Sequence, residues 1–574
     1  MKSFLSRPYL TLLWTAVVLV LTLTPAAEMP ETPEWKLLSF DTAGHAGVFA
    51  VLAGLAWFWA RARVRRPGAV VLLGCVLLGA AIEVVQYAMH AGRHAEWTDL
   101  LADGIGAVLA LLLLNLGQRS YRRLTAATAA LLLAGPVAHA QPAAPAAAPD
   151  LARARRTIEA LAAPAMHGRG YVQQGEHVAA AYLRGRLQAL GLQPLAPDYT
   201  QPFTLDVNTF PGVVKLQLSR SRLPQFGKQY LLQPGRDFIA APISAGGSSG
   251  GYQPVCYLDS ATLTTPARLA YFLQFIHHPC IVVVADRYAQ QLTHQPAAVS
   301  ARLDSAVAVI KVVPKLTASL APQQGATIQL EALPNPLFSF VPNTPVTTAA
   351  SAGIVQLDAQ LLRNYQTQNL AAVVRGNVRP DSFVVVTAHY DHLGMMGKDV
   401  YFPGANDNAS GVALLLELAA HYARPENQPA CSVAFLLFGA EEAGLLGSSY
   451  FVQHPLLPLP RIKFLVNLDL LGTGEEGATV VNGRVYEAAY QRLLALNATH
   501  HYLPRLTARG RAANSDHFPF SEAGVPAFFM YTRGGSLAYH DVHDQPAALS
   551  LAGFAGAYGL VRDFLNATGA APVQ

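Results

Sequence analysis

The hydrophobic pattern divides the chain into two unlike parts. The first part consists of long apolar stretches with short polar gaps, at 10–24, 43–60, 69–89 and 97–117. Stretches of this length approach the roughly 20 apolar residues that a helix needs to cross a bilayer. Arginines lie between the second and third stretches and after the fourth, so the positive-inside rule places the N-terminus in the cytoplasm. The pattern therefore predicts an all-α transmembrane bundle of four helices, formed by residues 1–120.

A fifth apolar stretch at 124–140 follows two arginines and ends in Ala138-His139-Ala140. Small residues at such positions are typical of a signal-peptide cleavage site. A linker rich in alanine and proline then continues to residue 149. The segment 121–149 is thus either a fifth span or an internal signal peptide with its linker, and in both cases the chain that follows leaves the cytoplasm.

Beyond residue 149 the apolar runs shorten to the length of strands. Buried strands are predicted at 384–387, 433–438 and 464–468. Between 206 and 337 the pattern changes to brief β-like runs with glycine-rich breaks. We expect a C-terminal α/β/α domain with a mixed, mostly parallel central sheet, formed by 150–205 and 338–574, and a β-rich domain inserted at 206–337.

Side chains that can bind metal ions follow these strands. Zinc binds imidazole nitrogen and carboxylate oxygen, and two ions that lie close together share a ligand. The chain offers five such residues, His389, Asp407, Glu442, Asp469 and His540. We interpret His389 and Asp469 as the ligands of one ion, and Glu442 and His540 as the ligands of the other. Asp407 would bridge the two ions.

Glu441 precedes a predicted ligand and is itself left without an ion. Neighbouring side chains at the end of a strand point in different directions, so Glu441 can face the attacking water while Glu442 faces an ion. A carboxylate in that place acts as a general base and passes the proton of water to the leaving amine. Taken singly, the His-x-Asp and Glu-Glu motifs are typical of surface positions. Their common order within one α/β pattern favours a metal site.

The motifs resemble those of the zinc aminopeptidase family with co-catalytic metals, which also contains glutamate carboxypeptidases and glutaminyl cyclases. The matching motifs are HxD at His389 and Asp391, GxxDNxSG around Asp407, AEE at Glu441 and Glu442, NxD at Asp469, SDH at Ser515–His517, and YH at Tyr539 and His540 with Asp544 beyond. The resemblance implies two Zn²⁺ per catalytic domain. It also implies that Asp391 orients His389 and that Tyr539 donates to the oxyanion of the tetrahedral intermediate. The inserted segment is similar in size to a protease-associated domain.

The N-terminal part resembles the VanZ-like membrane family. The resemblance rests on Glu83, Gln86, Arg93, Asp99 and the segment Asp103–Gly106. Ionisable residues within apolar helices are costly and are candidates for function. These residues either converge on one polar site or pair with one another to hold the bundle together, and the resemblance implies only a role in the cell envelope.

Composition narrows the classes of partner. The net charge of +5 is modest, and no basic stripe with interleaved aromatic residues is present, which excludes nucleic acid as an expected partner. Four cysteines are too few for a disulfide scaffold, although Cys256 and Cys280 could pair in an oxidising compartment. The oligomeric state is left open.

The sequence therefore predicts an exported, membrane-anchored zinc metallopeptidase that acts on peptides, and most specifically an aminopeptidase. Its expected location is the bacterial inner membrane, with the catalytic domain in the periplasm or outside the cell. One alternative is a carboxypeptidase, dipeptidase or other amide hydrolase on the same site. Another is a receptor that binds peptides without hydrolysing them, which the presence of Glu441 argues against. A full set of ligands for two ions disfavours a glutaminyl cyclase.

Overall fold

The computed structural model describes most of the chain in two compact units, one within 1–145 and one within 146–574. The described residues are 8–23, 40–61, 63–64, 67–89, 102–111, 148–276, 278–285, 288, 291–292, 294–338 and 349–570. The predicted fifth apolar stretch at 124–140, most of its linker, and Arg93 and Asp99 lie outside these residues.

The N-terminal unit is helical where it is described. It contains α1 (Pro8–Leu23), α2 (Phe40–Ala60), α3 (Pro67–Met89) and a further helix at 102–111. Helices α1, α2 and α3 contact one another. Their shared core includes Phe49, Leu52, Trp57 and Ile82, so apolar side chains that the sequence offers for a membrane pack partly on each other.

The prediction of a transmembrane bundle is wrong for this structure. Within the described residues, none of the helices combines the length and the apolar character needed to span a bilayer. The described residues of helix α1, 16 in number, extend about 24 Å at 1.5 Å per residue, whereas the hydrocarbon core is about 30 Å thick.

The second unit is built on a nine-stranded mixed sheet in the order β1-β12-β16-β13-β17-β20-β18-β19, with β2 paired to β12. The strands are β1 (Gln193–Pro194), β2 (Thr200–Thr209), β12 (Gln360–Val374), β13 (Arg379–His389), β16 (Cys431–Phe438), β17 (Ile462–Leu468), β18 (Gly477–Val481), β19 (Leu506–Ala508) and β20 (Ala527–Arg533). The four central strands, β16, β13, β17 and β20, are mutually parallel. Their carboxyl ends therefore meet at one edge of the sheet.

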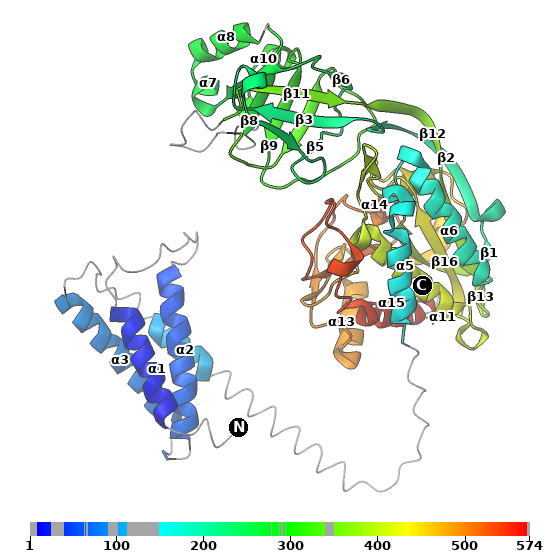
Figure 1. The fold of residues 1–574 in the computed structure, drawn as a ribbon. Coiled ribbons are helices and arrows are strands. Elements are labelled where there is room, and N and C mark those ends of the chain that lie inside the picture. The colour runs from blue at the N-terminus through cyan, green and yellow to red at the C-terminus, as the bar shows by residue number, and fades with distance from the viewer. Residues whose placement is uncertain are drawn as a thin grey trace. The chain divides into compact units, whose positions relative to one another are not determined.

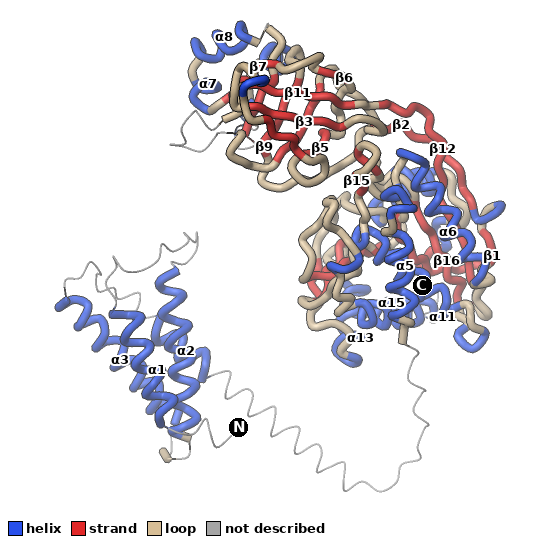
Figure 2. Tube along the Cα trace, viewed as in Figure 1, coloured by secondary structure: helices blue, strands red, loops and turns tan. Residues whose placement is uncertain are grey.

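Helices cover both faces of this sheet, as Figure 2 shows. One face packs against α5 (Leu151–Leu161), α6 (Gly175–Ala189), α11 (Gly411–Tyr422), α13 (Glu487–His500) and α15 (Phe554–Ala570). The other face packs against α12 (Leu446–Gln453) and α14 (His517–Glu522). Alternation along β13 supplies both cores, since Val384 and Val386 face the first layer and Val385 faces the second. This is the expected α/β/α arrangement with a mixed sheet.

A second nine-stranded sheet forms the inserted part, in the order β4-β3-β11-β7-β8-β9-β10-β5 with β6 paired to β11. Its strands are β3 (Val214–Ser219), β4 (Gln229–Leu232), β5 (Phe238–Ala240), β6 (Gly247–Ser248), β7 (Gln253–Leu258), β8 (Ile281–Ala285), β9 (Ala308–Val312), β10 (Ile328–Ala332) and β11 (Ala352–Leu357). Short helices α7 (Ser260–Thr264), α8 (Pro266–Phe275) and α10 (Ala297–Leu303) accompany them. The paired strands β2 and β12 connect the two sheets (Figure 1).

Because β11 pairs with β3, this sheet extends past residue 337, the expected end of the insertion. Cys256 and Cys280 are both buried free thiols.

Candidate metal centre

The carboxyl ends of three adjacent parallel strands place most of the predicted ligands. His389 is the last residue of β13, and Asp469 directly follows β17. Glu441 and Glu442 follow β16 after a short turn in which Ala440 has a φ of 56°. Since β13 lies between β16 and β17, these side chains arrive at the same edge of the sheet. Edges of this kind are where open α/β sheets build their sites.

Asp407 reaches the same place from a turn, Ala405–Ser410, that leads into α11. The carboxylate of Asp544 holds this turn, because it accepts hydrogen bonds from the backbone N–H groups of Asn406, at 2.9 and 3.0 Å, and of Asp407, at 3.0 Å. Asp544 thereby fixes the backbone of a predicted ligand. The sequence motif had included Asp544 without giving it a role.

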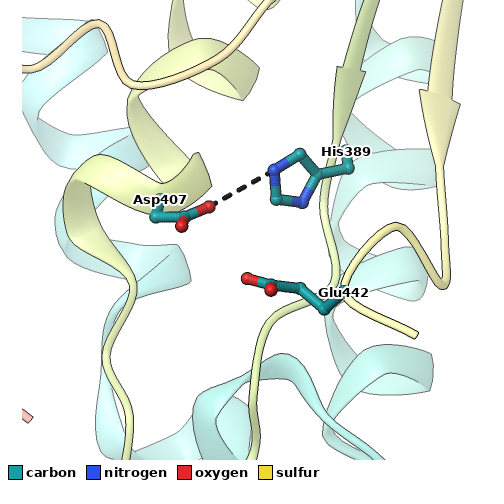
Figure 3. Close-up of side chains that lie close together, drawn as sticks. All are labelled: His389, Asp407 and Glu442. Atoms are coloured by element: carbon teal, nitrogen blue, oxygen red, sulfur yellow. Dashed lines mark ion pairs between the residues drawn. The ribbon is translucent and has the colours of Figure 1, made fainter. Parts of the chain in front are cut away.

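The carboxylate of Asp407 lies between the two predicted ligand histidines. Its Oδ1 is 3.3 Å from Nε2 of His389, and its Oδ2 is 3.2 Å from Nε2 of His540. Nε2 of His389 also lies 3.4 Å from Oδ1 of Asp469, and Nε2 of His540 lies 3.0 Å from Oε2 of Glu442. Figure 3 shows His389, Asp407 and Glu442 pointing into one space from three separate segments. The five side chains therefore form two groups that share Asp407.

The donor set of this space fits zinc. Ligand atoms of His389, Asp407 and Glu442 lie within 4.8 Å of one another, as do those of His389, Glu441 and Asp469. All the donors are imidazole nitrogens or carboxylate oxygens, which zinc binds. Oδ1 of Asp469 is buried and accepts no hydrogen bond from the described part of the chain. Buried polar atoms usually have a partner, so this oxygen is placed as a free ligand atom would be.

The pKa shifts reflect the crowding of charge. Burial lowers the pKa of His540, but the carboxylates of Glu442 and Asp407 outweigh it and raise that pKa to about 11. Burial and Asp407 raise the pKa of Glu442, whereas His540 and His392 bring it down to about 2. Burial raises the pKa of Glu441 well above its ordinary value, against the effect of His389 and with that of Glu442. The carboxylates thus depend on nearby positive charge, which a bound cation supplies.

Glu441 and Asp391 are linked through the backbone. The Glu441 carboxylate lies 4.0 Å from Nε2 of His389, beside the predicted ligands. The carboxylate of Asp391 accepts hydrogen bonds from the backbone N–H groups of Glu441, at 3.1 Å, and Glu442, at 3.3 Å. It lies 3.8 Å from Nδ1 of His389, and that nitrogen is 3.2 Å from the Asp391 carbonyl oxygen. The Asp391 carboxylate therefore orients the Glu-Glu turn, while the Asp391 carbonyl oxygen is the nearer partner of His389.

Tyr539 lies at the rim of the centre. Its ring stacks on the imidazole of His540 at 3.9 Å between centroids, and the residue is 49% exposed. Partial burial of the phenol, together with the nearby carboxylates of Asp407 and Glu442, raises its pKa. The phenol therefore stays protonated and able to donate a hydrogen bond.

Three further features of the centre were not predicted from the sequence. The first is His392, whose Nδ1 is 2.6 Å from Oε1 of Glu442. The second is Arg169, a fully buried guanidinium that donates to the backbone carbonyls of Tyr390, Gly404 and Asp407, among others. It ties the segment after β13 to the turn that carries Asp407.

The third feature is a chain of buried side-chain hydrogen bonds that ends on Asp469. Thr387 Oγ1 donates to Asn467 Oδ1 at 2.6 Å, and Asn467 Nδ2 donates to Ser515 Oγ at 2.8 Å. Ser515 Oγ then donates to Asp469 Oδ2 at 2.8 Å. With one oxygen of Asp469 occupied in this way, the other is left to face His389. Such outer hydrogen bonds fix ligand orientation in metal sites.

Two family models match separate parts of this chain. Residues 369–565 match peptidase family M28, and residues 8–118 match VanZ/LLP1. The predicted resemblance to the zinc aminopeptidase family in the C-terminal part and to the VanZ-like family in the N-terminal part is confirmed.

Curated relatives align with the C-terminal part. Aminopeptidase YwaD of Bacillus subtilis is 34% identical over 173 residues, 29% of this chain and 36% of the relative. An aminopeptidase of Pseudomonas aeruginosa is 39% identical over 121 residues, 21% of this chain and 20% of the relative. Leupeptin-inactivating enzyme 1 of Streptomyces exfoliatus is 31% identical over 155 residues, 27% of this chain and 33% of the relative. Each alignment thus covers at most 36% of the relative's own length.

Solved structures agree on the fold. A zinc aminopeptidase from Bacillus subtilis superposes with a TM-score of 0.52 at 21% identity and covers 72% of this chain and 93% of its own. A peptidase M28 precursor from Shewanella amazonensis superposes with a TM-score of 0.54 at 16% identity and covers 74% of this chain and 94% of its own. The part of this chain that superposes on these structures is longer than residues 369–565, which match the family M28 model.

Proposed function

We propose that the C-terminal part of this chain, a family M28 peptidase by sequence, is a zinc aminopeptidase with two ions in the centre described above. The observation that supports this most directly is the position of Asp407, whose two oxygens face two different imidazoles. In the proposal, His389 and Asp469 hold one ion. Glu442 and His540 hold the other, and Asp407 serves both.

The bound ions would polarise the scissile carbonyl and acidify a water molecule beside it. The protein supplies the proton transfers. The carboxylate of Glu441, next to His389, takes a proton from the attacking water and delivers it to the nitrogen of the leaving amine. Asp391 holds the backbone of Glu441 in place for this task, and the protonated Tyr539 phenol is available to donate to the oxyanion.

The aminopeptidase assignment draws on the relatives, two of which are named aminopeptidases. A free α-amine is also compatible with the chemistry of the site, because its ammonium can donate to a carboxylate such as that of Glu441. A carboxypeptidase, dipeptidase or other amide hydrolase on the same centre is the main alternative. A receptor that binds peptides without hydrolysis would have no use for a buried carboxylate in the position of Glu441.

The experiment is metal analysis combined with hydrolysis of peptides by the purified full chain. We expect two zinc ions per chain, release of the N-terminal residue from unblocked peptides, and loss of that activity with a chelator. His389→Ala should lose an ion and activity, whereas His294→Ala, at an exposed histidine of the insertion, should keep both. Metal binding without hydrolysis would contradict the enzyme assignment and favour the receptor.

The location at an envelope membrane stays a prediction. It now rests on the match of residues 8–118 to the VanZ/LLP1 family.

A further inference from the structure

The loop that carries His540 follows β20 and has no regular secondary structure between residues 534 and 545. His540 itself has a φ of 56°, a left-handed conformation that non-glycine residues rarely adopt and that surrounding contacts must hold. These contacts come from the inserted part of the chain.

Ala318 of the insertion forms two hydrogen bonds with His540. The backbone N–H of Ala318 donates to the carbonyl oxygen of His540 at 3.1 Å. The carbonyl oxygen of Ala318 lies 2.8 Å from Nδ1 of the imidazole. A carbonyl oxygen can only accept, so Nδ1 carries the proton and donates it. Nε2 is then left facing Asp407 and Glu442, as a metal ligand requires.

Lys315 of the insertion also holds this loop, through backbone carbonyls that precede His540. Its Nζ donates to the carbonyl oxygens of Leu537, at 2.7 Å, and Tyr539, at 3.2 Å. Gly235 of the insertion also approaches this loop so closely that a Cβ there would lie 3.0 Å from Val542. The insertion thus meets the His540 loop on both sides of the histidine.

The segment 313–321 is itself held at both ends. The N–H of Val313 donates to the carbonyl oxygen of Ala332 in β10, at 2.9 Å, and the carbonyl oxygen of Ala321 accepts from the N–H of Asn208 in β2, at 2.8 Å. In its middle, Leu316 and Ala318 are buried, each 5% exposed. It therefore presents the Ala318 carbonyl in a fixed place.

We propose that the segment 313–321 of the insertion positions His540 for metal binding, and that Lys315 is a positioning residue in this arrangement. The inference rests on the proposed metal centre and adds that one of its two ions depends on the insertion. The hydrogen bonds cited for the other group are made by residues outside the insertion, since Asp469 accepts from Ser515 and His389 contacts Asp391. The two ions should therefore respond differently to changes in the insertion.

The test compares Lys315→Met with Lys228→Met in the full chain loaded with zinc. Both lysines are exposed residues of the insertion, but Lys228 lies over the ring of Tyr230. Competition with a chelator of known affinity gives the affinity of each ion. We expect Lys315→Met to weaken one ion by about tenfold, the lower end of the effect of outer partners, and to leave the other unchanged. Lys228→Met should change neither.

His540→Ala identifies which ion is affected, because it removes that ligand outright. The ion weakened in Lys315→Met should be the one that His540→Ala loses. The melting temperature of the metal-free Lys315→Met chain should equal that of the unaltered chain, which separates positioning from folding. Unchanged affinities in Lys315→Met, or equal weakening of both ions, would overturn the inference. An unaltered chain that binds no zinc would instead overturn the metal centre itself.

Discussion

Nδ1 of His392 is hydrogen-bonded to Oε1 of Glu442 at 2.6 Å, and both side chains are buried. The other oxygen of Glu442 faces His540. The Glu442 carboxylate thus contacts two imidazoles. His392 holds one of its oxygens in place, and the other oxygen faces His540 of the proposed ligand set. This division of the two oxygens makes His392 the partner that orients Glu442.

Replacing His392 should therefore weaken one ion without removing it. His392→Ala leaves Oε1 of Glu442 buried without its partner, and outer partners of ligands contribute about 10- to 100-fold to metal affinity. We expect a loss within that range for the ion on the His540 side, measured by chelator competition. His543→Ala, at an exposed imidazole in the same loop as His540, should have no effect. Equal affinities in the two variants would show that Glu442 is held by other means.

The proposed base gives a second prediction. Glu441→Gln should retain both ions, because Glu441 is not a ligand in the proposal, while kcat falls by about 100-fold or more through the loss of general-base catalysis. The measurement is steady-state hydrolysis together with zinc content. Glu426→Gln, at an exposed residue, is the matched control. Turnover near that of the unaltered chain would refute the role of Glu441, and loss of an ion would make it a ligand.

The residues that meet in the candidate centre could be predicted because each lies at the end of an apolar run or in a short motif. His389 is the last residue of β13 and Asp469 directly follows β17, so the pattern that predicts the strands also locates these two side chains. Arg169 could not be found in this way, since all its hydrogen-bond acceptors within the described residues are backbone carbonyls, such as those of Tyr390 and Gly404. Backbone acceptors leave no signature in the sequence. The Ala318 carbonyl beside His540 escaped prediction for the same reason.

The N-terminal helices show the limit of apolar patterning. Side chains such as Phe49 and Trp57 are buried against neighbouring helices, and a packed helix and a spanning helix draw on the same apolar residues. Helix length and apolar character decide between them, and sequence patterns locate the ends of elements least well. Glu83 was counted as a polar site within a span, and the structure places it in α3.

A third prediction concerns the pH dependence of stability. Burial, with Arg562 and Arg424 nearby, lowers the pKa of His421 to about 4, whereas in the unfolded chain it is about 6.5. Between these values the unfolded chain binds a proton that the folded chain does not, so the free energy of unfolding falls as the pH drops from 6.5 to 4. His421→Gln should reduce this loss.

The measurement is the melting temperature of the metal-free chain at pH 7 and pH 5, because zinc release at low pH would otherwise contribute. The decrease between the two pH values should be smaller in His421→Gln than in the unaltered chain. His294→Gln, at an exposed histidine, should match the unaltered chain. An identical decrease in all three would mean that His421 takes up its proton equally in both states.

The last prediction tests which end of a peptide the centre recognises. If a free α-amine is bound, its ammonium donates to a carboxylate of the site, and the carboxylates of Glu441 and Glu442 lie beside His389 and His540. An acetyl group removes that charge and adds bulk where the amine would lie. We expect N-acetylated peptides to be hydrolysed at least tenfold more slowly than the same peptides with a free N-terminus, and peptides amidated at the C-terminus to be hydrolysed at the unaltered rate.

The comparison is made by mass spectrometry of the peptide products that the full chain releases. If acetylation has no effect and amidation abolishes cleavage, the centre reads the C-terminus, and the carboxypeptidase alternative replaces the aminopeptidase while the metal chemistry stays the same.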